Sequence, residues 1–283
     1  MFRKHALASS YATAGTPDAQ NEIHAHMLGD IALLVKHLGN VNSVDPTPGH
    51  LLGALGSLGE QWRARVSYLP PVYSVQEPVL ALHLQLYDIV LNRYISQVAE
   101  SDAPTCTESV MRQIVSTNLQ AAQLARLAGF RATALGILTH AELTCAAKPA
   151  LLAPLQIEHA QILWDEGHAS DAMSAISRVA DSLWAKLRAQ DEDGGSADAG
   201  LASGVGTMSS NSQTADVDRV RAPTSLDIYD TKAAFAKAAL CLSLWQEVTN
   251  SVSTAVLQSR YERVLRVHES DKAHYEFGHF YDN

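Results

Sequence analysis

Two stretches of this chain, AQLARLAGFRATALGIL (122–138) and AQILWDEGHASDAMSAI (160–176), align without a gap at an offset of 38 residues. The alignment superimposes two turn glycines, Gly129 and Gly167. Similar residues also coincide on both sides of the turn: Ala122 with Ala160, Gln123 with Gln161, Ala134 with Ala172, and Leu138 with Ile176. Small residues thus recur where the two helices of a hairpin must approach closely. This spacing is typical of helix-turn-helix repeats, close to the tetratricopeptide class.

A single hairpin of this kind cannot bury its apolar face alone, so neighbouring hairpins are expected to stack into an α-solenoid. The concave surface of such an array normally holds a partner. The competing interpretation is a chance match between two alanine-rich amphipathic helices. We favour the repeat because the turn glycine and both flanks align together.

Apolar residues follow a helical period almost everywhere else, which predicts an all-α protein. Helices are expected at 23–38, with Gly39 and Asn40 as a stop, at about 78–98, at 227–247 and at 252–267. A segment with prolines and glycines, 45–59, follows the first helix, and Pro70-Pro71 predicts an extended passage. Pro78 is expected in the first turn of the helix that Glu77 opens.

Four regions are predicted. Residues 1–60 form an N-terminal helical region with little further assignment, and 61–189 hold helical hairpins. Residues 190–224 are rich in Asp, Gly, Ser, Ala and Thr, which predicts a disordered insertion, and 225–283 return to helices. We expect the chain to be a fragment or a truncated gene model, because its last element has only begun to bury its face.

Composition excludes several classes of function. The net charge is −9 and the 21 lysines and arginines are scattered, so no basic stripe is available for direct binding to nucleic acid. Apolar runs end before the length that a membrane span needs, so no membrane association is expected. The three cysteines lie far apart in sequence and suit buried free thiols in a reducing, intracellular compartment.

Two aromatic signatures flank the repeat: WRARVSYLPPVYSVQEPVLAL (62–82) and YEFGHFYD (275–282), the second preceded by SRYERVL (259–265). Together with the hairpins at 118–143 and 157–176, they resemble the FAT domain of the phosphatidylinositol-kinase-related protein kinases, most closely the ATR type. The resemblance covers about 60–282. The residues that carry it are Trp62, Arg65, Glu77, Pro78, Leu80, Gly129, Trp164, Gly167, Tyr261, Glu276, Gly278, His279, Phe280 and Tyr281. Tyr275 stands where the family usually has tryptophan, and His83 and Leu84 stand where ATR relatives usually have two arginines.

The resemblance implies a non-catalytic scaffold of an ATP-dependent serine/threonine kinase of the DNA-damage checkpoint, located in the nucleus. ATP and magnesium are expected only in a kinase domain outside this chain, and no cofactor within it. The implied partners are that kinase domain, other helical-repeat regions, and a regulatory partner like the ATR-interacting protein. The sequence itself lacks the lysine, catalytic aspartate and acidic magnesium ligands that phosphoryl transfer requires.

Other chemistry has little support. His24 and His26 point about 200° apart on a helix, and no cysteine pair accompanies them, so no metal site is predicted. Cys106, Cys145 and Cys241 lack the motif of a nucleophile, so no catalytic residue is predicted. The tryptophans are expected to pack between helices, and Arg63 and Arg65 to form helix-end ion pairs. The alternative function is a free-standing tetratricopeptide-like adaptor that binds a protein or peptide.

Overall fold

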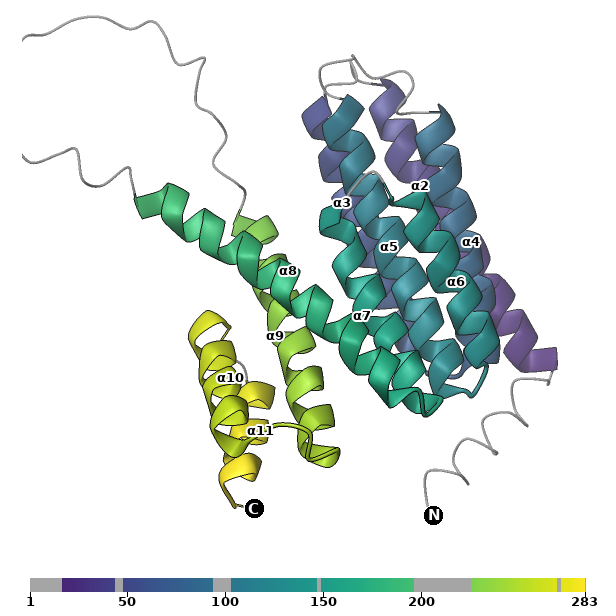
Figure 1. The fold of residues 1–283 in the computed structure, drawn as a ribbon. Coiled ribbons are helices and arrows are strands. Elements are labelled where there is room, and N and C mark those ends of the chain that lie inside the picture. The colour runs from purple at the N-terminus through teal and green to yellow at the C-terminus, as the bar shows by residue number, and fades with distance from the viewer. Residues whose placement is uncertain are drawn as a thin grey trace, which may run out of the picture. The chain divides into compact units, whose positions relative to one another are not determined.

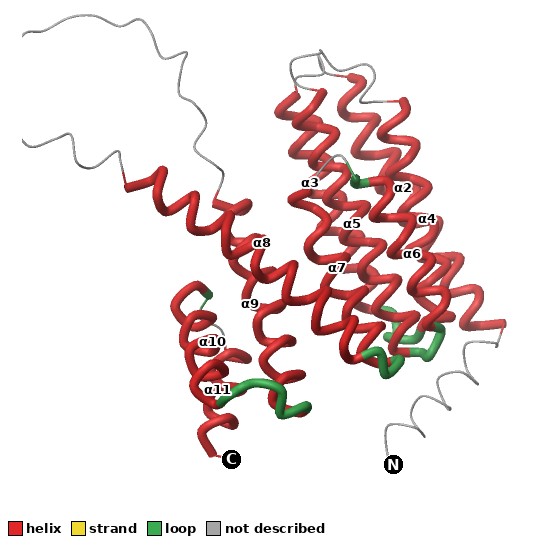
Figure 2. Tube along the Cα trace, viewed as in Figure 1, coloured by secondary structure: helices red, strands yellow, loops and turns green. Residues whose placement is uncertain are grey.

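The protein is described by a computed structural model that covers residues 17–43, 48–93, 103–146, 149–195, 225–268 and 271–282. Within these ranges the secondary structure is entirely helical, with no strand (Figures 1 and 2). The chain divides into two compact units, residues 1–162 and 163–283. None of the described helices is long and apolar enough to cross a membrane.

The first unit contains α2 (Pro17–Ser43), α3 (Pro48–Tyr68), α4 (Tyr73–Arg93), α5 (Ala103–Leu127), α6 (Arg131–Thr144) and most of α7 (Pro149–Asp165). Consecutive helices pair as α2 with α3, α4 with α5, and α5 with α6. Alternate helices also touch, α2 with α4 and α3 with α5, which is the two-layer stacking of an α-solenoid (Figure 1). One core joins all six helices, from Leu34 on α2 to Ile162 on α7.

The second unit contains α8 (Ala169–Gly195), α9 (Ser225–Val248), α10 (Thr254–Val267) and α11 (Asp271–Asp282). Helix α9 packs against α8, α10 and α11. The unit also includes the last residues of α7, where Trp164 stacks on Trp245 of α9 with centroids 4.7 Å apart. Trp184 of α8 stacks on Phe235 of α9 at 5.4 Å. The guanidinium of Arg263 lies 5.1 Å above the Trp184 ring. The tryptophans therefore pack between helices, as their apolar neighbours predicted.

The turns of the predicted repeat have the same hydrogen bonds at an offset of 38 residues. Gly129 has φ +89° and Gly167 has φ +86°. After α5, the Gly129 and Phe130 amides donate to the carbonyls of Arg126 and Ala125 at 3.0 and 2.8 Å. After α7, the corresponding Gly167 and His168 amides donate to the corresponding carbonyls, Trp164 and Leu163, at 3.0 and 2.9 Å. Each turn is a Schellman motif, which requires a left-handed residue after the helix.

Burial repeats with the same offset, which confirms the alignment found in the sequence. The six small or aliphatic residues that it pairs are all 0% exposed: Ala122, Ala134, Leu138, Ala160, Ala172 and Ile176. A third Schellman turn ends α9, where the Asn250 and Ser251 amides donate to Glu247 and Gln246 at 3.0 and 3.1 Å. There the left-handed residue is Asn250, with φ +49°. The internal alignment of the sequence did not include the α9–α10 hairpin, because asparagine stands there in place of the turn glycine.

Replacing Gly167 by Val is expected to destabilise the protein by about 1–3 kcal/mol, because a β-branched residue is strained at positive φ. A Cβ atom at Gly167 would meet no other heavy atom within 4 Å, so the loss would come from the backbone and not from a clash. Urea unfolding followed by circular dichroism measures it. The matched variant Gly167→Asn should lose less, since asparagine already holds this position at Asn250. Equal stability of Gly167→Val and the parent would contradict the turn assignment.

Several predicted boundaries differ from the structure. Helix α2 does not stop at Gly39 and Asn40 but continues to Ser43, and α3 begins at Pro48, inside the segment rich in proline and glycine. Helix α4 begins at Tyr73, so Pro78 lies in its second turn and does not open it. The first turn of α4 is held before Pro78, because the side-chain amide of Gln76 donates to the Val66 and Leu69 carbonyls at the end of α3, at 3.3 and 3.1 Å. The predicted helix residues 94–98 lie outside the described ranges.

The first part of the predicted insertion differs from its composition-based prediction. Helix α8 continues to Gly195, so the first six residues of 190–224 are helical. Residues 196–224 lie outside the described ranges, as do 1–16 at the start of the N-terminal region. At Pro70-Pro71 the predicted break in the helices is present, because no helix covers residues 69–72. The segment is a turn and not an extended passage, since the Val72 amide donates to the Pro70 carbonyl at 2.7 Å.

Candidate functional site

The first aromatic signature centres on Trp62, which is 1% exposed on α3. Its ring stacks on the imidazole of His83 from α4, with centroids 4.4 Å apart and planes 6° from parallel. Tyr87, one helical turn further along α4, meets the indole edge-on at 5.0 Å. Burial raises the pKa of Tyr87 well above its ordinary value, with Arg63 as a smaller opposing influence. These rings form an inter-helix contact that water cannot reach.

A buried carboxylate, Asp30 on α2, ties this ring cluster to a third helix. Its side chain is 0% exposed and accepts two contacts, from Arg65 Nε at 2.5 Å and from His83 Nε2 at 2.8 Å. Arg65 also donates to the His26 carbonyl at 3.1 Å. A Cβ atom at Gly29 would collide with the Arg65 guanidinium, so the glycine makes room for it. Because a buried charge is costly unless paired, Asp30 holds α2, α3 and α4 in one register.

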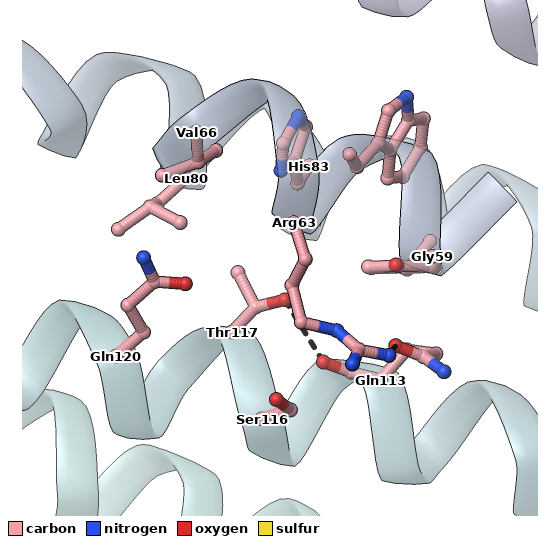
Figure 3. Close-up of a pocket in the computed structure, with 11 residues that line it drawn as sticks. Gly59, Arg63, Val66, Leu80, His83, Gln113, Ser116, Thr117 and Gln120 are labelled. Carbon is pink, nitrogen blue, oxygen red and sulfur yellow. Dashed lines mark hydrogen bonds between the residues drawn. The ribbon is translucent and has the colours of Figure 1, made fainter. Parts of the chain in front are cut away.

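Figure 3 shows a small cavity beside these residues, between α3, α4 and α5. Arg63 extends toward Gln113, to whose Oε1 its Nη2 donates at 3.4 Å, and Gln120 points toward Val66 and Leu80. The cavity holds about 10 Å³, roughly the space of one water molecule. Its volume excludes a nucleotide or a substrate. A partner that uses this face would therefore contact its exterior.

The second aromatic signature centres on Tyr261 of α10, which is 1% exposed. Phe277 and Phe280 of α11 pack on its ring, with centroids 5.7 and 5.4 Å away. The Tyr261 hydroxyl donates to Glu247 Oε2 on α9 at 3.4 Å. Burial raises the pKa of Tyr261 strongly, and the carboxylates of Glu247 and Glu276 raise it further. Tyr261 therefore joins three helices as a neutral phenol.

A family model for the FAT domain matches residues 49–283. The chain belongs to the FAT domain family. The match begins before Trp62 and includes nearly all of α3, so it extends the resemblance seen at 60–282. No curated protein matches the chain. The ATR type within the family stays a prediction.

The remaining signature residues of this FAT domain occupy several environments. Leu80 is 2% exposed in a core with Val66 and Val79, whereas Glu77 and Pro78 are half-buried on α4. Glu276 is half-buried and lines an open groove with Leu244, Glu247, Val248 and Tyr275. Gly278 is exposed, and nothing in the structure explains the glycine there. The side chains of His279 and Tyr281 lie outside what the structure describes. The structure thus collects Trp62, Arg65 and Leu80 in the first unit, and Tyr261, Glu276 and Phe280 in the second.

Sequence reasoning missed the partners that complete the first cluster. Asp30 lies 35 residues before Arg65 and 53 before His83, so no local motif connects them. A usable signal existed, since Asp30 falls on the apolar face of its helix with Ile23 and Leu34. A second buried carboxylate, Glu158 on α7, was missed in the same way. Its carboxylate accepts hydrogen bonds from Arg126 Nε at 2.6 Å and from Gln123 Nε2 at 3.1 Å, and both donors lie on α5.

Metal-ligating and thiol side chains are spread over the described helices of the FAT domain. No group of three His, Cys, Asp or Glu among them is placed to hold a metal ion. Cys106 and Cys145 are buried and are in no disulfide, and burial raises the pKa of Cys145, which disfavours a nucleophilic thiolate there. The buried polar residues described above are used to hold helices together.

Replacing Tyr261 by Phe is expected to flatten the loss of stability in alkaline solution. The folded pKa of Tyr261 is raised, so its contribution is complete below the unfolded value of about 10 and is lost as the pH rises beyond it. The free energy of unfolding of the parent should therefore fall more steeply there, by up to about 1.4 kcal/mol per pH unit. Urea midpoints on both sides of pH ~10 measure this.

Tyr68→Phe is the matched control, because Tyr68 is 83% exposed. This variant should follow the parent at every pH. An identical alkaline slope for Tyr261→Phe and the parent would show that Tyr261 ionises as readily in the folded protein as in the unfolded chain.

Proposed function

We propose that this chain is a non-catalytic scaffold segment of an ATR-like serine/threonine protein kinase in DNA-damage checkpoint signalling. It braces and regulates a kinase domain that is not among these residues. The observation that carries the proposal is the FAT match over 49–283, joined to the use of the signature residues as packing and ion pairs. ATP and magnesium are bound by the kinase domain and not by this chain.

The scaffold acts through stiffness. Asp30 fixes three helices of the first unit through two short polar contacts, and Glu158 fixes α7 to α5. Charges buried in this way resist sliding of one helix over another, because separating them leaves an unpaired charge away from water. A force applied by a partner at one hairpin is therefore passed to the next. The partners we propose are the kinase domain, further helical repeats, and a regulatory protein like the ATR-interacting protein.

The ATR-like assignment rests on the order of three motifs: the Trp62 element, the paired hairpins, and the GHFY sequence near the C-terminal end. His83 stands where ATR relatives usually have arginine. In this chain the imidazole of His83 stacks on Trp62 and contacts the Asp30 carboxylate, so this position joins α4 to both α3 and α2. A nuclear location is proposed on the same basis.

The proposal is tested by isolating the tagged native protein from its cells before and after DNA damage. We expect ATP-dependent phosphorylation of serine or threonine in a protein substrate, with more activity after damage. The purified 283-residue chain alone should transfer no phosphate. Kinase activity that is present but indifferent to DNA damage would retain the scaffold and refute the checkpoint role. Isolation of the native protein without any kinase activity would refute the scaffold and favour the adaptor.

A further inference from the structure

Folding brings arginines together on one face of the second unit, although the basic residues are scattered along the sequence. Arg260, Arg263 and Arg266 follow one another at three-residue spacing on α10, which places them towards one side of that helix. Arg263 and Arg266 are exposed, and Arg260 is half-buried. This side of α10 faces α8, because the Arg263 guanidinium lies 5.1 Å above the ring of Trp184. A positive surface therefore lies where α10 approaches α8.

The register of the two helices adds a fourth arginine. Burial lowers the pKa of the Arg260 guanidinium, the charge of Arg263 lowers it further, and Asp181 of α8 opposes both. Trp184 follows Asp181 by three residues, and Arg263 follows its partner on α10 by the same interval. The helices thus run in the same direction, which brings the exposed Arg188 level with the last turn of α10. We call the resulting set the arginine strip: Arg188, Arg260, Arg263 and Arg266.

Nearby carboxylates balance only part of the charge of the arginine strip. Asp181 acts on Arg260, whereas Glu262 lies on another side of α10 and accepts a hydrogen bond from Gln258 at 2.9 Å. Among the residues that the structure describes, no carboxylate forms an ion pair with the exposed arginines of the strip. The chain as a whole has a net charge of −9. An acidic ligand is therefore attracted to this face and repelled by much of the remaining surface.

The two inner arginines are held in place and keep donors for a ligand. Arg263 stacks on the face of Trp184, which leaves the N–H groups at the edge of the guanidinium available to a carboxylate. Trp184 is itself fixed by its stacking on Phe235 of α9. Arg260 donates from Nη1 to the side-chain carbonyl of Gln246 and has further N–H donors. Because these side chains are already ordered, binding costs less conformational entropy.

The spacing of the arginine strip indicates the shape of its ligand. Arg260 and Arg266 lie about 9 Å apart along the axis of α10 at 1.5 Å per residue, with Arg263 between them. Carboxylates at three- or four-residue spacing on a partner helix have the same rise and can each meet one guanidinium. A single phosphate is too compact, because Trp184 and Gln246 hold the inner two guanidinium groups separately. A nucleic acid would bring a long row of phosphates against a chain of net charge −9.

We propose that the arginine strip is a docking surface for an acidic helix of a partner protein, in which Asp or Glu recurs every three or four residues. Each carboxylate accepts hydrogen bonds from one guanidinium. One exposed ion pair contributes little, so binding depends on several pairs that form together, which makes the spacing decisive. The inference adds a class of partner to the proposed scaffold and does not depend on its kinase role.

Fluorescence anisotropy with the whole 283-residue chain tests the docking. The probe is a labelled, alanine-based helical peptide with glutamates at alternating three- and four-residue spacing. Its matched control has the same number of glutamates in one continuous run. We expect the spaced peptide to bind more tightly than the control, with an affinity that falls as salt is added. Equal binding of the two peptides, no binding of either, or tighter binding of a short DNA duplex would each overturn the proposal.

Paired substitutions separate the arginine strip from the general charge of the chain. Arg263→Gln with Arg266→Gln should raise the Kd for the spaced peptide at least about tenfold, because two charged donors are lost. Arg131→Gln with Lys186→Gln makes the same change of charge at exposed positions on α6 and on the other side of α8, and should bind like the parent. Circular dichroism checks that both variants stay helical. Equal weakening in the two would refute the docking surface.

Arginine footprinting locates the peptide on the parent chain without any substitution. Phenylglyoxal modifies accessible arginines, and mass spectrometry measures the extent of reaction at each one. The spaced peptide should protect Arg188, Arg263 and Arg266 and leave the exposed Arg131 reactive. Absence of protection on the strip, or protection of Arg131 to the same degree, would show that the peptide binds elsewhere and would contradict the proposal.

Discussion

Replacing Trp62 by Ala is expected to destabilise the first unit by about 3–5 kcal/mol, the largest effect of any single substitution considered. The indole is 1% exposed and touches the rings of both His83 and Tyr87, so its removal leaves a cavity between α3 and α4. It also removes the stacking partner that orients His83 toward Asp30. Urea unfolding followed by circular dichroism measures the loss.

Trp62→Phe separates the aromatic contact from the volume. This variant keeps a ring for His83 and should lose less stability than Trp62→Ala. A loss below about 1 kcal/mol for Trp62→Ala would mean that the site is exposed or repacks freely, contrary to the structure. The His83 imidazole resonances, followed by NMR, should shift in both variants, and more in the alanine variant.

Replacing Asp30 by Ala is expected to cost about 3 kcal/mol, since it leaves the buried imidazole and the Arg65 guanidinium without their shared carboxylate. The Arg65 side chain is 32% exposed and can regain some water, which keeps the loss at the lower end for a broken buried pair. The free energy of unfolding measures this directly.

Asp88→Ala is the matched control, because Asp88 is an exposed carboxylate on α4. It should change stability by no more than about 0.5 kcal/mol. The double variant Asp30→Ala with Arg65→Ala should lose less than the sum of the two single variants, because the two residues share one interaction. Similar losses for Asp30→Ala and Asp88→Ala would show that the ion pair adds nothing to the joining of α2 and α3.

The repeat could be read from the sequence because its signal is local and periodic. A left-handed glycine after α5 and after α7 fixes the turn, and buried alanines at matched positions fix how closely the helices approach. Both features depend on short spacings that the sequence preserves. The hairpin arrangement followed from them, and the all-α class followed from the helical period of the apolar residues.

Helix boundaries were harder to predict because tertiary contacts override local preferences. Gly39 and Asn40 resemble a stop, yet α2 continues, since Leu38 and its neighbours are held against other helices. Pro78 resembles a first-turn residue, yet α4 begins at Tyr73, directly after the turn at Pro70-Pro71. The contacts that hold α2 come from other helices, whereas those near the start of α4 come from Val66 and Leu69, only 10 and 7 residues before Gln76.

The candidate site was predicted only in part. Trp62 and Arg65 stood out through the family resemblance. His83 was noted only as a departure from the ATR pattern, and Asp30 was not noted at all. A single aspartate on an apolar helix face is ambiguous without knowledge of which helix lies opposite. The same limit applies to Glu158, which is paired with Arg126 from 32 residues earlier. The way the helices stack decides which buried charges meet, and this arrangement cannot be read directly from the sequence.

Cross-linking mass spectrometry on the native protein, isolated from its cells, tests the central claim most directly. Lys186 on α8 and Lys237 on α9 are exposed and available to a lysine-reactive reagent. If the chain braces a kinase, cross-links from these lysines to a protein kinase catalytic domain are expected. A preparation in which the chain cross-links only to itself, or to proteins without a kinase domain, would contradict the account.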